Sequence, residues 1–287
     1  MEPLFEHRLR LGGYRTRALE LEGRGPPIVL LHGFADSADT WRTAMDLLAR
    51  RERRALALDL PGFGAADELR EHEPILRQLD RFARAAVRHA AAEAGAEVVL
   101  VGNSLGGCVA LRAAERDELP LSGVVPVAPA GLEMPAWFAA VERDPIVRTL
   151  LAFPLPLPER AVRLAVGEAY RNLAFARPRA VARQVVETFT SHHRDRAAVA
   201  RYLESARRLL GELRSPFALE RVRCPVLLVW GDRDRMVTHL GARRVLQALP
   251  CTEYLLLEGC GHCPQIEEPE RFVDALAQFA LPRARAA

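Results

Sequence analysis

The feature that most constrains the fold is an alternation of short apolar runs with helical stretches. Continuous apolar runs are typical of strands buried on both faces, and their alternation with helices is typical of a parallel sheet. The sequence therefore predicts an α/β protein with a doubly wound, mostly parallel sheet and an antiparallel hairpin near 14–21. The apolar runs lie at 28–31, 55–58, 98–101, 124–128, 226–230 and 254–257, and the helical stretches at 75–94, 104–116 and 268–280.

One interval, from about 131 to 221, breaks this alternation. It has no run typical of a strand, and Pro-punctuated helical segments are expected instead. We expect an all-helical cap over the end of the sheet where ligands bind, outside the carboxyl ends of the strands. The chain then divides into a first core part (1–130), a helical cap (131–221) and a second core part (222–287). The expected cap helices lie around 135–143, 159–174, 178–192 and 196–213.

Six aromatic residues of the cap interval have two possible places. They could line a pocket for the acyl group of a substrate, or they could form the interior of the cap itself, and the sequence does not separate the two. These residues are Trp137, Phe138, Phe153, Tyr170, Phe175 and Phe189.

Composition excludes several classes of chemistry. All 40 cationic residues of this 287-residue chain are Arg, so no lysine is present for a Schiff base or for a phosphate-binding G-x-x-x-x-G-K-[ST] loop. The formal charge of +3 is close to balance and the Arg are interleaved with acids, so we expect no nucleic-acid partner. The 49% of hydrophobic residues is ample for a sizeable core.

No targeting or membrane signal stands out. An apolar run of roughly 20 residues is absent, so we expect no stable membrane insertion, and the start MEPLFEHRLR lacks the apolar region of a secretory signal. The odd count of five Cys does not suggest a disulfide framework. These observations favour a cytoplasmic location.

The strongest chemical signal is a G-x-S-x-G motif between a predicted strand and a predicted helix. Gly102 and Gly106 allow the two elements to approach closely, and the tight turn would present the hydroxyl of Ser104 at the top of the sheet. The start of the following helix offers backbone N–H groups. Ser104 is therefore the candidate nucleophile, against the alternative of an ordinary glycine-rich turn with a helix-capping serine.

A second signal is the His32-Gly33-Phe34 turn after the strand predicted at 28–31. Acyl transfer places negative charge on the former carbonyl oxygen, and a fixed donor lowers that cost by roughly 3 kcal/mol. The backbone N–H groups of Phe34 and Leu105 are the candidate donors. We interpret His32 as structural.

Two late signals complete the set. The strand predicted at 226–230 is followed by Asp232 and Asp234, and His262 follows the strand predicted at 254–257. A serine hydroxyl needs a base, and an imidazole works best when a carboxylate orients it. Ser104, then one of the two acids, then His262 follows the chain order of one known class of serine hydrolase.

With these motifs in this order, the chain resembles the serine hydrolases of the α/β-hydrolase fold superfamily, from about residue 10 to 280. The resemblance implies Asp234, in the G-x-x-D pattern that starts at Gly231, as the acid in preference to Asp232. It also implies that Asp59-Leu60-Pro61-Gly62-Phe63-Gly64 is a structural turn, that the insertion is a cap, and that no cofactor is needed.

Within this superfamily we expect an esterase-like or lipase-like carboxylic ester hydrolase acting on a small-molecule ester or acyl substrate. Ser104 stands where the similar epoxide hydrolases and haloalkane dehalogenases have an Asp nucleophile. Carbon–carbon hydrolases share the G-N-S-x-G-G motif but have a glycine-rich loop where this chain has FADSADTW. A carbon–carbon hydrolase, a cofactor-free haloperoxidase, an acyltransferase and a non-enzymatic ligand receptor stay as alternatives.

Cys260 and Cys263 flank the candidate base in a C-x-x-C spacing. A zinc site would need a second pair of ligands, which the sequence does not offer, so we expect no metal. We interpret both thiols as small apolar fillers, with a reversible disulfide between them as the alternative.

Overall fold

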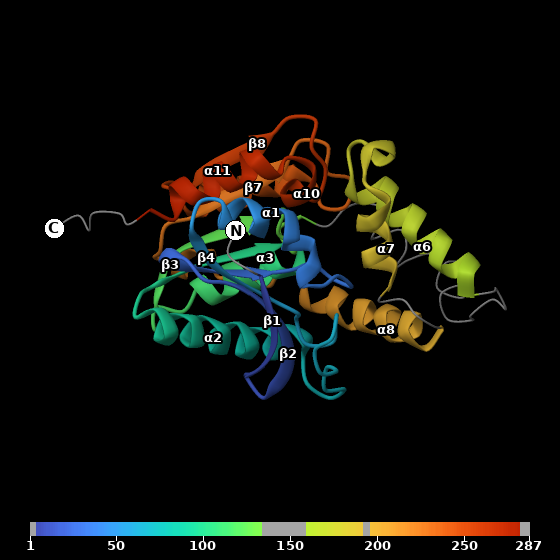
Figure 1. Cartoon of the computed structure of the whole chain (residues 1–287), viewed down its shortest axis with the longest axis horizontal. Helices are drawn as coiled ribbons and strands as arrows, with labels where there is room; N and C mark the ends of the chain where they lie inside the picture. The colour runs from blue at the N-terminus through green and yellow to red at the C-terminus, as the bar shows by residue number, and fades with distance from the viewer. Residues whose placement is uncertain (1–3, 134–158, 192–195, 282–287) are drawn as a thin grey trace.

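A central sheet with helices on both faces forms the core of the protein (Figure 1). The computed structural model describes residues 4–133, 159–191 and 196–281, and in these residues eight strands form one sheet of order β1-β2-β4-β3-β5-β6-β7-β8. β2 is antiparallel to β1 and to β4, and the other pairs are parallel. The strands are β1 (Phe5–Leu11), β2 (Tyr14–Leu21), β3 (Arg24–Leu31), β4 (Arg53–Leu58), β5 (Val98–Asn103), β6 (Leu121–Val127), β7 (Leu227–Gly231) and β8 (Glu253–Leu257).

The predicted fold class is confirmed by this sheet. Each predicted apolar run lies in or against a strand. The segment 14–21, near which a hairpin was expected, is the single strand β2, and it forms an antiparallel hairpin with β1. β1 itself was not predicted, because its sequence, FEHRLRL, has no apolar run. It is a strand at the edge of the sheet, and most of its side chains are exposed.

The side chains of the central strands divide the core into two layers. In β3, Val29 and Leu31 pack toward α2 (Ile75–Ala94) and α3 (Leu105–Ala114). Ile28 and Leu30 pack toward the opposite face, against α1 (Arg42–Ala49) and α11 (Pro269–Phe279). Because successive side chains of a strand point to opposite faces, a strand covered on both faces must be apolar throughout.

The helical insertion lies between β6 and β7, at one end of the sheet (Figure 1). The predicted helices at 159–174 and 196–213 correspond to α6 (Glu159–Ala174) and α8 (Arg196–Glu212). The segment predicted at 178–192 is instead a 3-10 turn, Pro178–Ala180, followed by α7 (Arg183–Ser191). The helix predicted at 135–143 lies outside the described residues, and the exact division at 130/131 and 221/222 stays a prediction.

Three of the six cap aromatics pack on one another, and Tyr170 and Phe175 also pack with Cys263 of the core. The rings of Tyr170 and Phe189 stack with centroids 3.7 Å apart, and Phe175, which is fully buried, meets Tyr170 edge-on at 5.3 Å. Trp137, Phe138 and Phe153 lie outside the described residues. The described helices include none with the length and apolar character needed to cross a membrane.

β5, α3 and the end of β3 meet without a layer of side chains between them. A Cβ atom on Gly102 would lie 2.1 Å from the carbonyl oxygen of Gly106. A Cβ on Gly106 would lie 2.3 Å from the carbonyl oxygen of Leu31. The backbone of the turn at Ser104 is therefore held in direct contact with both neighbours.

We expect Gly102→Ala to lower the free energy of unfolding by at least about 3 kcal/mol, because rigid backbone atoms occupy the position of the new methyl group. The matched control is Gly211→Ala near the end of α8, where a Cβ meets nothing within 4 Å. This change should be neutral or stabilise by up to about 1 kcal/mol. Urea unfolding of both variants checks the prediction, and equal stabilities would contradict it.

Candidate active site

Ser104 lies at the carboxyl end of β5 with a backbone conformation that few non-glycine residues adopt, φ 53° and ψ −111°. Its N–H donates to the carbonyl of Val127 at 2.9 Å, and its own carbonyl accepts from the N–H groups of Cys108 and Ala130. These bonds hold a strained turn between strand and helix, the conformation expected of a nucleophile elbow.

Asp234 and His262 form a buried pair at the same edge of the sheet. Nδ1 of His262 lies 2.7 Å from Oδ2 of Asp234, and both side chains are almost fully buried. With the Nδ1 proton donated to the carboxylate, Nε2 carries the lone pair. Nε2 is buried and has no hydrogen-bond partner in the described part of the chain, so this nitrogen is available to take a proton.

The surroundings of Asp234 fix the carboxylate. Oδ1 accepts from the backbone N–H groups of Met236 and Val237, at 2.8 and 2.9 Å, and Oδ2 also accepts from the Trp230 indole N–H at 3.1 Å. The alternative acid, Asp232, points to another place, where it accepts from the N–H of Gly259 at 2.7 Å. The structure thus places Asp234, and not Asp232, against His262.

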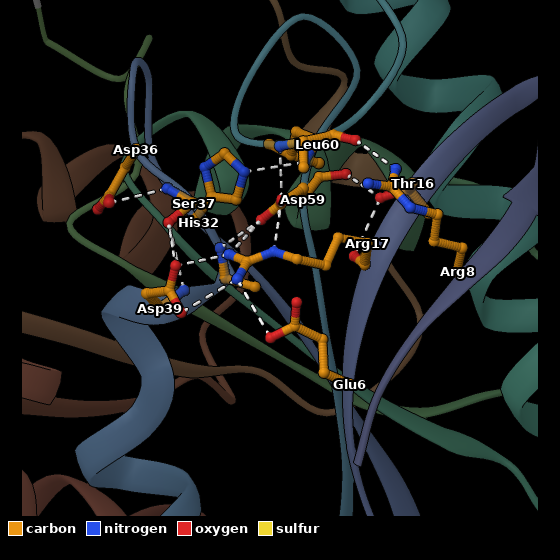
Figure 2. Close-up of polar contacts among 12 residues, drawn as sticks. Glu6, Arg8, Thr16, Arg17, His32, Asp36, Ser37, Asp39, Asp59 and Leu60 are labelled. Carbon is orange, nitrogen blue, oxygen red and sulfur yellow. Dashed lines mark hydrogen bonds and ion pairs between the residues drawn. The ribbon is translucent and has the colours of Figure 1, made fainter. Parts of the chain in front are cut away.

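The loop after β3 runs beside Ser104. A Cβ on Gly33 would lie 3.4 Å from Cβ of Ser104, so the neighbouring Phe34 lies near the candidate nucleophile. His32 is fully buried, with Nδ1 2.7 Å from the Gly33 carbonyl and Nε2 accepting from the Leu60 N–H at 2.8 Å (Figure 2). His32 therefore ties the loop to the end of β4 and takes a structural position.

The two expected oxyanion donors come from different elements. Phe34 belongs to the loop after β3, and Leu105 is the first residue of α3, where a helical N–H has no partner within the helix. The ring of Phe34 packs against Phe63 and Tyr202, with centroids 5.2 and 6.5 Å away. Phe34 is thus held between the turn after β4 and the cap helix α8.

A network of charged groups, shown in Figure 2, holds the rest of this loop. The guanidinium of Arg17 in β2 binds Asp39 at 2.6 Å and Asp59 at 3.0 Å. The Asp59 carboxylate, which is fully buried, also accepts from the N–H groups of Ala38 and Ala65. Strand β2, the loop and the turn after β4 are therefore joined through one side chain, Asp59, and one cation, Arg17.

Mutual stabilisation keeps this network charged. Burial alone would lower the pKa of Arg17, but hydrogen bonds to Asp39 and Asp59 outweigh it and raise that pKa. Burial would likewise raise the pKa of Asp39, but Arg17 and Arg42 lower it to about 2. An ion pair that is satisfied on both sides in this way costs most when one partner alone is removed.

Sequence reasoning assigned no role to Asn103, which immediately precedes the candidate nucleophile. Its amide nitrogen donates to the carbonyl of His262 at 3.0 Å and lies 3.3 Å from that of Val127. Asn103 thereby links the end of β5 to the backbone of the candidate base. It was visible in the G-N-S-x-G-G motif, but nothing in the motif indicates a partner 159 residues away.

Cys260 and Cys263 are both buried and unpaired, and they pack in different apolar clusters. Cys260 faces Leu257 and Phe272 in the core, whereas Cys263 lies with Ala174 and Phe175 of the cap region. Burial raises the pKa of both thiols, which favours the protonated form over the reactive thiolate. The described residues contain no group of three His, Cys, Asp or Glu side chains that could hold a metal ion.

One buried carboxyl of the loop after β3 makes stability depend on pH. Burial raises the pKa of Asp36 from 3.8 to about 7, against a hydrogen bond from the Ser37 N–H. Between about pH 4 and pH 7 the unfolded chain has lost this proton while the folded protein keeps it. The contribution of Asp36 to stability therefore falls as the pH rises through this window.

We expect Asp36→Asn, which imitates the protonated side chain, to remove this dependence. The free energy of unfolding of the variant minus that of the parent should increase by about 2 to 4 kcal/mol from pH 4.5 to pH 8. Urea unfolding at both pH values measures it. Asp46→Asn, at an exposed position of α1, is the control and should change the free energy of unfolding by the same amount at both pH values. If the Asp36 variant also changed it by the same amount at both pH values, the prediction would be wrong.

Comparison with known proteins identifies the family of this chain. The model of the alpha/beta hydrolase family matches residues 28–275. A 2-hydroxy-6-oxo-6-(2'-aminophenyl)hexa-2,4-dienoic acid hydrolase of Metapseudomonas resinovorans is 28% identical, over 97% of this chain and 92% of its own. A pimeloyl-[acyl-carrier protein] methyl ester esterase of Xanthomonas campestris pv. campestris is 29% identical, over 92% of this chain and 99% of its own.

Solved structures of similar architecture cover almost the whole chain. A bacterial membrane phospholipase A superposes with a TM-score of 0.77 at 25% identity, over 96% of this chain and 85% of its own. The 2-hydroxy-6-oxo-6-phenylhexa-2,4-dienoate hydrolase of a Rhodococcus also gives 0.77, at 23% identity, over 97% of this chain and 99% of its own, and shares the fold. Since the family model spans most of the sequence and the fold agrees, this chain belongs to the alpha/beta hydrolase family.

Proposed function

We propose that the protein is a serine hydrolase that cleaves carboxylic esters through an acyl-enzyme. The observation that carries the proposal is the buried His262–Asp234 pair at 2.7 Å, with Nε2 of His262 unpartnered, at the sheet edge where the strained turn presents Ser104. A cytoplasmic location, a small-molecule ester or acyl substrate and no cofactor belong to the same proposal.

The reaction follows from the roles of these groups. Nε2 of His262 takes the proton of Ser104 as its oxygen attacks the ester carbonyl, and Asp234 stabilises the imidazolium that forms. The N–H groups of Phe34 and Leu105 hold the oxyanion, each by roughly 3 kcal/mol. The alcohol leaves with the proton from His262, and water activated by His262 then releases the acid.

Carbon–carbon bond hydrolysis is the second candidate, supported by the relative from Metapseudomonas resinovorans and by the G-N-S-x-G-G motif. One feature favours the ester hypothesis: the loop after His32-Gly33 is FADSADTW and not glycine-rich. Assaying a 2-hydroxy-6-oxohexadienoate beside p-nitrophenyl esters separates the two activities.

Replacement of Ser104 by Ala should lower kcat/KM for p-nitrophenyl acetate by about 10⁴-fold or more, because no other group supplies the attacking oxygen. A fluorophosphonate should label the parent at Ser104 and leave the variant unlabelled, as read by mass spectrometry. Ser215→Ala, at an exposed position, is the control and should behave as the parent. Parent-like hydrolysis by the Ser104 variant would rule the proposal out.

The two acids after β7 should respond differently to the same change. Asp234→Asn should lower kcat by about 10³- to 10⁴-fold, because the imidazole loses the carboxylate that sets its tautomer. Asp232→Asn should stay within about threefold of the parent, since an Asn oxygen can still accept from the Gly259 N–H. Steady-state kinetics of the two variants gives the comparison, and the reverse ranking would assign the role to Asp232.

A further inference from the structure

A second carboxylate, Glu267 at the end of α10 (Pro264–Glu267), binds the backbone beside the candidate base. Oε1 accepts at 2.6 Å from the N–H of Gly261, the residue immediately before His262. Oε2 accepts at 2.8 Å from the N–H of Ala176, a residue that follows the cap helix α6. One side chain thus joins two segments that are separated by about 85 positions in the sequence.

The cap segment also contacts the candidate base directly. The N–H of His262 donates to the carbonyl of Ala174, the last residue of α6, at 2.7 Å. On its other side the carbonyl of His262 accepts from Asn103 at 3.0 Å. The backbone of His262 is therefore held by the cap on one side and by the end of β5 on the other.

Gly261 shows how closely these segments approach. A Cβ at this position would lie 2.6 Å from the Ala174 carbonyl oxygen, 2.7 Å from the Ala176 nitrogen and 2.7 Å from Oε1 of Glu267. Two of these three atoms belong to the backbone of the cap, so a methyl group could fit only if the cap moved away. The absence of a side chain at Gly261 is a condition for the contact.

The bonding of Glu267 suits a carboxylate. Burial raises its pKa, while backbone N–H groups of Gly261, Ala176 and Arg177 oppose that shift by binding the charged form. Hydrogen bonds with one charged partner are stronger than neutral ones. A Gln at this position would present an NH₂ group to one of these N–H donors and lose that bond.

We infer that Glu267 is a positioning residue that fixes the cap segment 174–177 onto the loop 260–262, so that the seating of the cap determines the position of His262. The inference rests on the proposed function for its catalytic consequence. Its structural part, the coupling of cap and loop, stands on the hydrogen bonds alone.

The first test is hydrogen–deuterium exchange of the full-length protein, read by mass spectrometry. Glu267→Gln should raise the exchange of the amides near 174–178 and near 259–263 together, because both segments lose a shared partner. Glu268→Gln is the matched control, since that side chain makes no hydrogen bond to either segment in the described part of the chain, and it should leave both unchanged. Faster exchange confined to 259–263, or none, would overturn the inference.

The second test is kinetic. Glu267→Gln should lower kcat for p-nitrophenyl acetate, and the rate of fluorophosphonate labelling of Ser104, by about 10- to 100-fold, the scale of a small misplacement of a catalytic group. KM should change less than about threefold. General unfolding would give a different result, because it would reduce the number of active sites and leave the kcat per labelled site unchanged. Parent-like kcat in the variant would refute the catalytic consequence.

Gly261→Ala provides an independent route to the same state and replaces Glu267→Gln if that variant does not fold. Both changes separate the same two segments, so the double variant should lose little more activity than either single variant. Additive losses would show two unrelated effects and refute the inference. If the parent neither reacts with the fluorophosphonate nor cleaves an ester, the proposed function fails, and the exchange measurement still decides the coupling.

Discussion

The direct contact of β3, β5 and α3 through backbone atoms is the constraint on which the site depends. Where Gly102 meets Gly106, and Gly106 meets the Leu31 carbonyl, no side chain separates the elements. This contact leaves the intervening residue, Ser104, in a conformation with positive φ. It also brings the loop after β3 to the same point, because that loop begins one residue beyond Leu31. The positions of the candidate nucleophile and of the expected oxyanion donors therefore result from one packing arrangement.

The loop after β3 is held by a network of charges as well as by the apolar contacts of Phe34 and Trp41. Arg17 binds two carboxylates at once, and the buried Asp59 accepts from backbone N–H groups on two segments. The planar, forked guanidinium suits this double engagement better than an ammonium group would. At this position the geometry therefore accounts for an Arg in place of a Lys. Nothing in the structure explains why the cations elsewhere on the surface are also all Arg.

Cap and core meet at the candidate catalytic residues as well as at the periphery. Tyr202 of α8 packs near Phe34, and the end of α6 contacts the His262 backbone. The insertion therefore contacts the loop after β3 and the candidate base from two different helices. A shift of the cap relative to the core would therefore displace both the loop after β3 and the backbone of His262. The cap is thus part of the geometry of the site.

The sequence by itself determined the elements and their order, because burial on one or both faces leaves a periodic pattern in the chain. Helices 75–94 and 159–174 were predicted with the bounds observed, and every predicted run lies at a strand. It also indicated which positions follow the carboxyl ends of the strands, namely Ser104, His262 and two possible acids. Only the tertiary structure placed Asp234 against the imidazole, paired Asn103 with the His262 backbone, and joined Arg17 to Asp39 and Asp59. Such contacts join residues far apart in sequence, and they leave no periodic pattern because packing alone brings them together.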